Sequence, residues 1–310
     1  MTTLYLTHPD CLEHEAPPGH PERPDRLRAI WRGLEDQRFA GLDRREARAA
    51  DPGLALLAHD EGYCEALQGL IPAEGRIAHV DADTYLSAHS WPAIQRAIGA
   101  ATQAVDAVMS GQVKNAFCAI RPPGHHAERA RAMGFCLFNN AAIAARHAQR
   151  AHGAERIAIV DWDVHHGNGT QDIFWSDPSV LYASSHQWPL YPGTGAASET
   201  GEQGNIVNLP LPSGTGSQGF RNGFEGVILP RVAGFMPDLI VISAGFDAHR
   251  RDPLASLELG EDDFAWATRK LMAIADRHCD SRIVSVLEGG YDLIGLAGSV
   301  SAHVEALMEA

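Results

Sequence analysis

The chain has few cysteines, and their spacing offers no pairing pattern. The five are Cys11, Cys64, Cys118, Cys136 and Cys279. Their number is odd and no two form a Cys-X-X-Cys pair, which argues against a disulfide framework or a cysteine-rich zinc site. The first ten residues, MTTLYLTHPD, have neither a basic start nor an apolar core, so no secretory signal is predicted. We therefore expect free thiols in a reducing compartment and a cytoplasmic protein.

Long apolar runs and a surplus of positive charge are also missing. The longest apolar runs, such as Leu239–Ala244, are far too short to span a bilayer. The 25 Lys and Arg residues face 39 Asp and Glu residues, which gives a net charge of −14. A protein that binds nucleic acid needs basic groups to neutralise phosphates. We expect neither a membrane nor a nucleic-acid partner, and the acidity favours cationic substrates.

No repeat, low-complexity tract or Ser/Gly linker divides the 310 residues. Apolar residues make up 45% of the chain and charged residues 21%, which is typical of a globular protein. A chain of this length can bury the core of one large α/β domain. We predict a single domain over residues 1–310, with its oligomeric state left open.

Short apolar runs alternate with amphipathic helical patterns. The expected strands are Leu4–Thr7, Ala116–Ile120, Ile157–Asp161, Val180–Ser184, Asn205–Leu209, Leu239–Ala244 and Ile283–Leu287. The expected helices are Arg23–Leu34, Ala93–Met109, Asn140–Ala151, Gly219–Val232 and Glu261–Arg277. Continuous apolar strands are typical of a parallel sheet buried on both faces. The pattern predicts an α/β fold with an open, mostly parallel sheet and helices on both faces.

Four of these strands lead directly into polar or glycine-rich loops. The loops read RPPGHHA, DWDVHHGNG, GFDAHRRDPL and EGGYDL. In open α/β sheets, ligands bind outside the carboxyl ends of the strands. The four loops are therefore expected to converge on one rim of the sheet and to form one site from distant parts of the chain.

The loop DWDVHHGNG has the composition of a metal site. Asp161, Asp163 and His165 alternate, so their side chains leave an extended chain on the same side. Asp247, in a second loop, supplies a further oxygen. Two carboxylates and one imidazole leave coordination positions open for water and substrate, as in catalytic zinc sites. The alternative, a surface loop with incidental Asp and His residues, is disfavoured by four such groups within six residues.

The adjacent His125 and His126 follow two prolines and a glycine. They are either an exposed pair or, beside a metal, the base and acid that hydrolysis requires. A carboxylate partner stabilises a charged imidazole, whereas a neutral amide does not. Asp161 and Asn168 offer both kinds of partner. The histidine that contacts Asn168 is predicted to be the better neutral base.

Tyr291 follows two glycines and is either a packed tyrosine in a tight turn or a functional donor. In the second case its hydroxyl stabilises the oxyanion that forms during amide hydrolysis.

Together these segments resemble the zinc-dependent histone deacetylase superfamily over nearly the whole chain. The segments that carry the resemblance are GHPERPDRL, RPPGHHAERARAMGFCLFNN, DWDVHHGNGTQDIF, YPGTG, SAGFDAHRRDPL and LEGGYDL. It implies an arginase/deacetylase-like fold and a zinc-dependent amidohydrolase that removes the acyl group of acyl-lysine or a similar acylated amine.

The resemblance also implies roles for individual residues. Zinc is held by Asp163, His165 and Asp247. Asp161 pairs with His125, Asn168 pairs with His126, and Tyr291 donates a hydrogen bond in the transition state. The substrate-binding positions are Gly134, Phe135 and Tyr191 along a tunnel, Leu254 at its mouth and Arg26 near an inner cavity that receives acetate. Potassium is expected at the backbone carbonyls of Asp161, Asp163 and His165, with Ser184 and Ser185.

Asparagine at position 168 departs from part of the family, where many members carry aspartate, and it is similar to the class II branch and its bacterial relatives. A neutral partner leaves His126 uncharged. We therefore assign His126 as general base and acid, and give His125 a mainly electrostatic role.

Three other functions remain open on the sequence. An acetylpolyamine amidohydrolase shares the implied fold and zinc site, although Leu254 stands near the place where polyamine-selective relatives often carry an acidic residue. An arginase-like ureohydrolase needs two manganese ions and further carboxylates. A non-catalytic, metal-bound binding protein is the third.

Two other patterns are interpreted without a catalytic role. The stretch Gly214–Gly219 has the GxGxxG form of a dinucleotide-binding loop. Its context is wrong, because Pro210 and Pro212 interrupt the junction between strand and turn. Four histidines on helical patterns, for which solvated or capping positions are favoured over metal binding, are His147, His152, His278 and His303.

Overall fold

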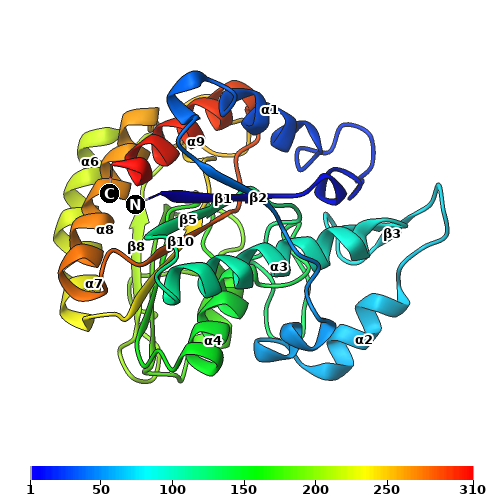
Figure 1. Cartoon of the computed structure of the whole chain (residues 1–310), viewed down its shortest axis with the longest axis horizontal. Coiled ribbons are helices and arrows are strands. Elements are labelled where there is room, and N and C mark those ends of the chain that lie inside the picture. Colours follow the sequence, from blue (N-terminus) through cyan, green and yellow to red (C-terminus); the bar gives the residue numbers. More distant parts are fainter. Residues whose placement is uncertain (1, 310) are drawn as a thin grey trace.

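Eight parallel strands form one twisted sheet in the computed structural model, which describes residues 2–309 (Figure 1). Their order is β2-β1-β5-β10-β9-β6-β7-β8. The strands are β1 (Thr3–Thr7), β2 (Asp43–Glu46), β5 (Asn115–Cys118), β6 (Ile157–Asp161), β7 (Val180–Gln187), β8 (Ile206–Leu211), β9 (Leu239–Ala244) and β10 (Ile283–Leu287). The predicted single-domain α/β fold is confirmed.

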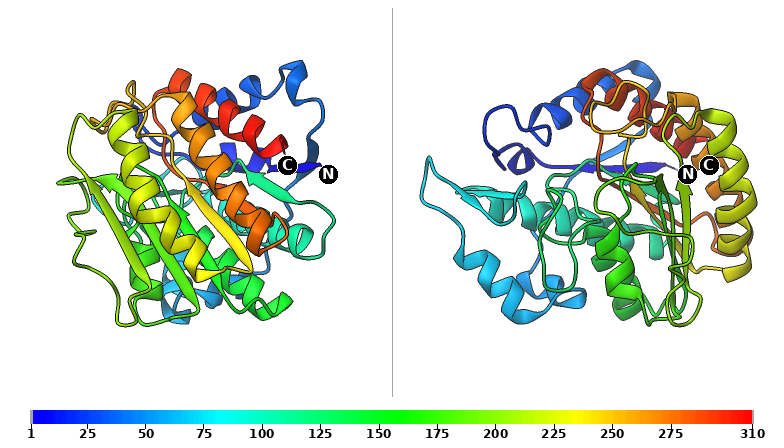
Figure 2. Two further views of the ribbon diagram at one scale, coloured as in Figure 1. Left: turned by 90° about the vertical axis from the view of Figure 1, so that its left-hand side faces the viewer. Right: turned by 180° about the vertical axis from the view of Figure 1, so that it is seen from behind.

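Helices cover both faces of the sheet (Figures 1 and 2). The helices are α1 (Asp25–Gly33), α2 (Glu61–Gly69), α3 (Ser90–Met109), α4 (Asn140–His152), α5 (Asn168–Phe174), α6 (Ser217–Gly223), α7 (Leu229–Phe235), α8 (Glu261–His278) and α9 (Leu293–Met308). A π-helical turn, Phe224–Ile228, joins α6 to α7, and short 3₁₀ turns occupy Pro9–Leu12, Gln37–Phe39 and Pro52–Leu57.

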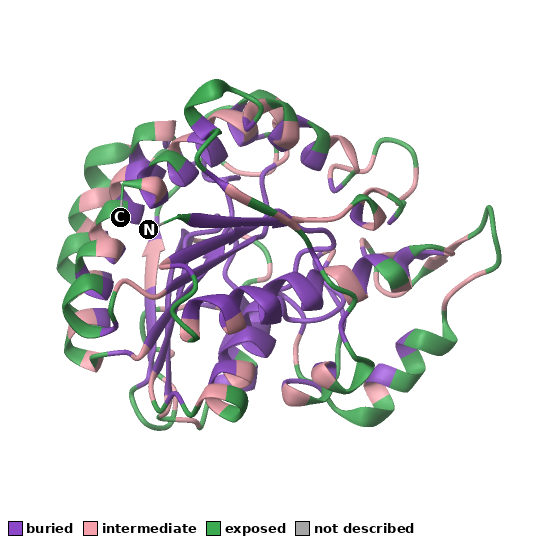
Figure 3. Cartoon of the chain, in the orientation of Figure 1, coloured by how far each residue is buried: buried purple, intermediate pink, exposed green. Residues whose placement is uncertain are grey.

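Alternate residues of each strand enter two separate cores. On β1, Leu4 and Leu6 pack in the core beneath α3 and α4, whereas Tyr5 packs in the opposite core with α1, α8 and α9. The strands β6, β9 and β10 are buried along their whole length (Figure 3). Burial on both faces explains why these strands are continuous apolar runs in the sequence.

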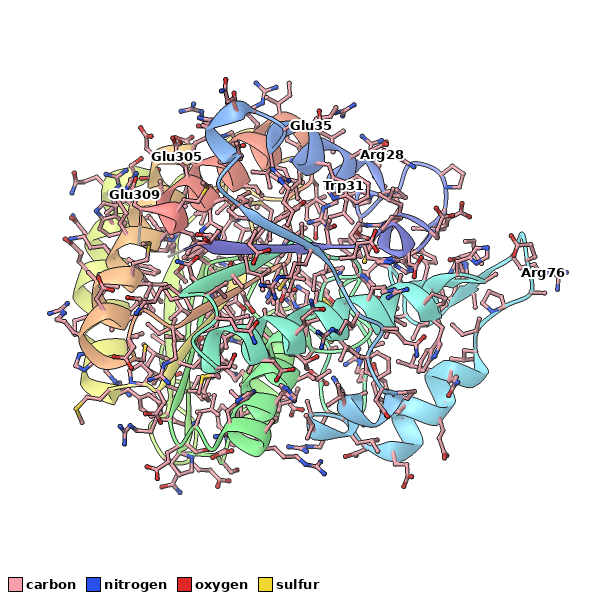
Figure 4. All side chains as sticks on the ribbon, viewed as in Figure 1. Arg28, Trp31, Glu35, Arg76, Glu305 and Glu309 are labelled. Carbon is pink, nitrogen blue, oxygen red and sulfur yellow. The ribbon has the colours of Figure 1, made fainter. Side chains whose placement is uncertain are left out.

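Three strands are not predicted from the sequence, β2 because it is polar, and the other two because each has only three residues. The edge strand β2 reads DRRE and alternates between half-buried and exposed residues. A small antiparallel hairpin, β3 (Ile77–His79) and β4 (Tyr85–Ser87), lies outside the main sheet. The loop that leads into this hairpin extends away from the sheet and carries Arg76 at its far end (Figure 4).

The predicted end of β8 is wrong. The strand continues through Pro210 to Leu211, with Pro210 opposite His186 of β7. Proline is tolerated here because β8 is the last strand of the sheet and needs backbone partners on one side only. The stretch Gly214–Gly219 forms the turn before α6 and the start of that helix.

Burial overturns a second expectation, the solvated or capping role of His303. This residue lies on α9, outside the predicted helix ranges, and is fully buried. Its ring nitrogens lie 2.7 Å from Thr268 Oγ1 and 2.9 Å from Ser285 Oγ. It is a hydrogen-bonded histidine of the core.

A close backbone contact fixes the position of α3. A Cβ atom on Gly99 would lie 1.8 Å from the carbonyl oxygen of Arg48, so only glycine fits. We expect Gly99→Ala to lower the free energy of unfolding by roughly 1–3 kcal/mol, although alanine is the better helix former. Gly62→Ala in α2 is the control, because nothing lies within 4 Å of its added Cβ. Denaturant unfolding measures both, and equal stability of the two variants would contradict this packing.

Candidate active site

The four polar loops follow four adjacent strands, β5, β10, β9 and β6. All their pairings are parallel, so their carboxyl ends lie at the same edge of the sheet. Asp161 of β6 lies opposite Ser243 of β9, which in turn lies opposite Val286 of β10. This register brings the loops that contain Asp163, Asp247 and Tyr291 together, as the sequence predicts.

Asp163, His165 and Asp247 form a buried cluster in which one ligand atom of each lies within 4.8 Å of the others. His165 Nδ1 lies 3.2 Å from Asp163 Oδ1 and 3.1 Å from Asp247 Oδ2. The remaining carboxylate oxygens accept backbone hydrogen bonds. Gly289 N donates to Asp163 Oδ2 at 2.8 Å, and Val164 N donates to Asp247 Oδ1 at 2.8 Å. The three groups are therefore held in fixed orientations.

The donor atoms of this cluster suit a divalent cation. Burial and the neighbouring Asp163 carboxylate raise the pKa of Asp247 to about 7. Burial opposes the charging of His165, but hydrogen bonds to Asp163 and Asp247 raise its pKa to about 10. Two carboxylates and one imidazole make up the donor set of many catalytic zinc sites, and a metal ion would neutralise the buried negative charge. These residues fit zinc.

Glycine at position 289 is required by the same cluster. A Cβ atom there would lie 2.1 Å from Asp247 Oδ2 and 2.6 Å from Asp163 Oδ2. The backbone of the tyrosine loop therefore packs directly against the two carboxylates.

His125 pairs with a carboxylate. Its Nδ1 lies 3.0 Å from Asp161 Oδ2, which also accepts a hydrogen bond from Tyr182 Oη at 3.0 Å. Burial opposes a charge on this imidazole, but the carboxylates of Asp163 and Asp161 raise the pKa of His125 to about 10. The imidazole is thus held in its charged form at neutral pH.

His126 pairs with an amide. Its Nδ1 lies 2.8 Å from Asn168 Oδ1, and Asn168 Nδ2 donates to Glu128 Oε1 at 2.7 Å. Glu128 thereby fixes the orientation of the amide, so Asn168 Oδ1 accepts the Nδ1 proton of His126 and leaves Nε2 free as a base. Burial, followed by the charges of His125 and His165, holds the pKa of His126 well below its usual value.

Glu288 connects the histidine loop to the tyrosine loop. Its Oε2 accepts hydrogen bonds from Gly124 N at 2.6 Å and from His125 N at 3.1 Å. The residue is fully buried and immediately precedes Gly289. The Glu288 carboxylate therefore fixes the position of the histidine loop relative to the tyrosine loop.

Tyr291 is held by one contact to its backbone and one to its ring. Asp252 Oδ2 accepts its N–H at 2.7 Å, and the guanidinium of Arg26 lies 4.9 Å from the centre of its ring. Arg26 also donates to the carbonyls of Gly290 and Glu288. Burial raises the pKa of Tyr291 well above its usual value, so the phenol stays protonated and able to donate.

A cleft of about 230 Å³ leads to the cluster of Asp163, His165 and Asp247, and His165 is one of its lining residues. Its lining residues are Asp83, His126, Gly134, Phe135, His165, Leu190, Tyr191, Leu254 and Tyr291. The rings of Phe135 and Tyr291 lie 5.7 Å apart and those of His126 and Tyr191 lie 5.2 Å apart. A larger hollow of about 500 Å³ between α1 and α9 contains none of the groups described above.

An unusual backbone conformation shapes one wall of the cleft. Gly134 and Phe135 both have positive φ, 56° and 68°. A Cβ on Gly134 would lie 2.4 Å from His126 Cδ2, so glycine is required beside the imidazole. Such a conformation is costly for phenylalanine, and Phe135 is held in it by a hydrogen bond of its N–H to Thr84 Oγ1 at 3.0 Å.

Arg26 and the two serines lie outside the cleft. Arg26 is completely buried beside Glu22, 3.0 Å from it, and does not line the cleft, so a direct contact with substrate stays a prediction. Ser184 Oγ lies 2.9 Å from His186 Nδ1. Ser185 Oγ is buried and has no hydrogen-bond partner among the described residues.

Sequence reasoning missed several groups that the fold brings to this site. Glu128, Asp252 and Glu288 lie within segments that carry the family resemblance, and their position beside the predicted site residues was a usable signal. Tyr182 lies on a predicted strand and gives no such signal. Asp83 and Leu190 line the cleft from loops without a recognisable motif.

The parallel sheet and the residues at its edge are those of a hydrolase of the deacetylase type. Residues 20–307 match the family model of the histone deacetylase domain. The chain is 42% identical to a probable deacetylase of Archaeoglobus fulgidus, over 99% of this chain and 86% of that protein. It is 41% identical to the polyamine deacetylase HDAC10 of Mus musculus, over 99% of this chain and 48% of that protein.

A solved structure agrees. The crystal structure of the HDA15 HD domain superposes with a TM-score of 0.92 at 38% sequence identity, over 100% of this chain and 89% of that one. The chain belongs to the histone deacetylase family.

The amide partner of His126 leads to a prediction about pH. We expect the double change Asn168→Asp and Glu128→Gln to place a carboxylate beside His126 without opposing a second one. A negative charge at this distance raises a histidine pKa by roughly 1–3 units. Because protonated His126 cannot accept a proton, the acidic limb of the kcat/KM profile should move to higher pH.

The matched control is Asn168→Ala with Glu128→Gln, which removes the hydrogen bond and adds no charge. It should lower activity without an upward shift of the acidic limb. An identical profile for both double variants would contradict the link between this side chain and His126.

Proposed function

We propose that the protein hydrolyses the amide of N-acetyl-lysine, or of a similar acylated amine, in a zinc-dependent reaction that gives a free amine and a carboxylate. The observation that carries the proposal is the cleft between Phe135 and Tyr191, whose inner residues are His126, His165 and Tyr291. A narrow, largely aromatic passage suits an extended alkyl chain, and the polar groups at its end suit a carbonyl.

Asp163, His165 and Asp247 would hold the zinc ion. When bound, zinc would activate a water molecule and polarise the acyl carbonyl. His126 accepts a proton at Nε2, because its Nδ1 is committed to Asn168. The same imidazole then returns the proton to the departing amine. Tyr291 donates a hydrogen bond from its hydroxyl group to the developing oxyanion, and the charge on His125 adds electrostatic stabilisation.

A potassium ion beside the zinc loop is part of this proposal. Ser185 lies on β7, beside the strand that carries Asp161, and its buried Oγ has no hydrogen-bond partner within residues 2–309. An unsatisfied buried oxygen is costly, and a cation would satisfy it. Ser184 and the backbone carbonyls of Asp161, Asp163 and His165 complete the proposed ligand set.

A second candidate substrate is an acetylated polyamine. It is supported by Asp83, whose carboxylate belongs to the cleft that contains Leu254. An acidic group at the entrance attracts the second ammonium of a polyamine, and the mouse relative HDAC10 is a polyamine deacetylase. Leu254 provides no such charge, so we rank acyl-lysine first.

We further propose a reducing compartment such as the cytoplasm. All five cysteines are buried and unpaired, which supports this location. Across residues 2–309 no helix is both long and apolar enough to cross a membrane.

A hydrolysis panel on zinc-loaded protein tests the substrate. It compares acetyl-lysine peptides, longer acyl-lysines, acetylated polyamines and, for an arginase-like activity, arginine. We expect acetyl-lysine to be preferred, a zinc-chelating hydroxamate to inhibit, and Tyr291→Phe to lower kcat roughly 100-fold or more. Asp83→Asn should weaken polyamine hydrolysis more than peptide hydrolysis. Urea release from arginine, or no hydrolysis of any acylated amine, would refute the proposal.

The two histidines are tested separately. We expect His126→Ala to lower kcat by about 100-fold to 10,000-fold, because the base is lost, and His125→Ala to have a smaller effect. Steady-state rates at equal zinc occupancy measure both. If His126→Ala retained most activity while His125→Ala lost it, the assignment of the base would be reversed.

A further inference from the structure

A second group of metal-binding side chains lies outside the cleft, where α3 packs against α4. Asp106 comes from α3, and His147 and His152 come from α4. Nε2 of His147 and Nε2 of His152 each lie 2.8 Å from the same oxygen, Oδ1 of Asp106. The three ligand atoms all lie within 4.8 Å of one another. Two imidazoles from one helix thus converge on a single carboxylate of another.

This convergence has the composition of a transition-metal site. Imidazole nitrogens together with a carboxylate oxygen suit zinc and copper ions. Partial burial opposes ionisation of Asp106, but hydrogen bonds from His152 and His147 lower its pKa, so it is present as a carboxylate. Metal binding uses the tautomer in which Nδ1 carries the ring proton, so that each Nε2 lone pair is free to bind the ion in place of its hydrogen bond to Asp106.

The position in the fold adds to the attraction for a cation. His152 is the last residue of α4, and Asp106 lies in the last turn of α3. The carboxyl ends of helices carry partial negative charge. The nearby Arg146 of α4 is committed to Asp177, with Nη1 2.5 Å from Oδ2, and therefore does not pair with Asp106.

The cluster is also accessible. The side chains of His147, His152 and Asp106 are 14%, 23% and 48% exposed. An ion can therefore enter, and water can fill its remaining coordination positions, as at a three-ligand site. We propose that Asp106, His147 and His152 bind a divalent transition-metal ion, with Zn²⁺ as the first candidate, and so link the ends of α3 and α4.

Another histidine and carboxylate pair provides a matched control. His89 Nε2 lies 3.2 Å from Glu74 Oε2, and both side chains are well exposed. This pair supplies two ligands instead of three, so its affinity for zinc should be much weaker. Neither group belongs to the cleft.

The test begins with protein whose cleft is loaded with zinc. It is dialysed against a buffer of fixed free Zn²⁺, and zinc per chain is measured by elemental analysis. We expect one equivalent beyond the zinc of the cleft in the wild type and after His89→Asn. That equivalent should be lost in His147→Asn, His152→Asn and Asp106→Asn, with the rate of acetyl-lysine hydrolysis unchanged. Equal zinc content in the wild type and the three cluster variants would overturn the proposal.

Two further measurements do not depend on the variants. At a free Zn²⁺ concentration about 100 times its Kd, the bound ion should raise the Tm by roughly 5 °C. Copper is added to protein that holds zinc in the cleft only. Copper bound at the second site should give an electron paramagnetic resonance spectrum with two coordinated imidazole nitrogens. A spectrum without imidazole ligands, or a Tm that does not respond to zinc, would count against the site.

Discussion

The buried carboxylates of Asp163 and Asp247 are the constraint on which the site depends. Both are held by backbone N–H groups, from Gly289 and Val164, and share one imidazole, His165. Two negative charges this close and this far from water are costly unless a cation compensates them. The fold maintains the arrangement because four adjacent parallel strands deliver the loops to one edge.

The partners of His125 and His126 give the two imidazoles different charges and therefore different proposed roles. A carboxylate beside His125 favours its charged form, whereas the amide of Asn168 beside His126 leaves a neutral base. The two rings are only 4.0 Å apart, so the charge on His125 itself disfavours a second charge on His126. Glu288 connects the histidine loop to the tyrosine loop, and Arg26 donates a hydrogen bond to the carbonyl of Gly290 in the tyrosine loop. The proposed division of roles follows from these partners.

Much of this arrangement is predictable from the sequence, for a physical reason. Strands buried on both faces are continuous apolar runs, so β6, β9 and β10 have the predicted bounds. Parallel strands place their carboxyl ends together, which is why distant loops could be assigned to one site. The pairing of each histidine followed from the family resemblance, and the distances in the structure agree with it.

The remaining features depend on tertiary context. The strand β2 is polar because it lies at the sheet edge, and Pro210 fits within β8 for the same reason. His303 is buried because α9 packs so that this side chain reaches Thr268 of α8 and Ser285 of β10, two partners that are distant in the sequence. Asp83 reaches the cleft from a hairpin that no local pattern connects to the site.

The account depends most on the proposed zinc site formed by Asp163, His165 and Asp247 at the strand ends. Crystals of the zinc-loaded protein, measured at wavelengths on both sides of the zinc absorption edge, test it directly. We predict an anomalous peak bonded to Nδ1 of His165 and to carboxylate oxygens of Asp163 and Asp247. Full zinc loading with no peak at these three residues would contradict the account.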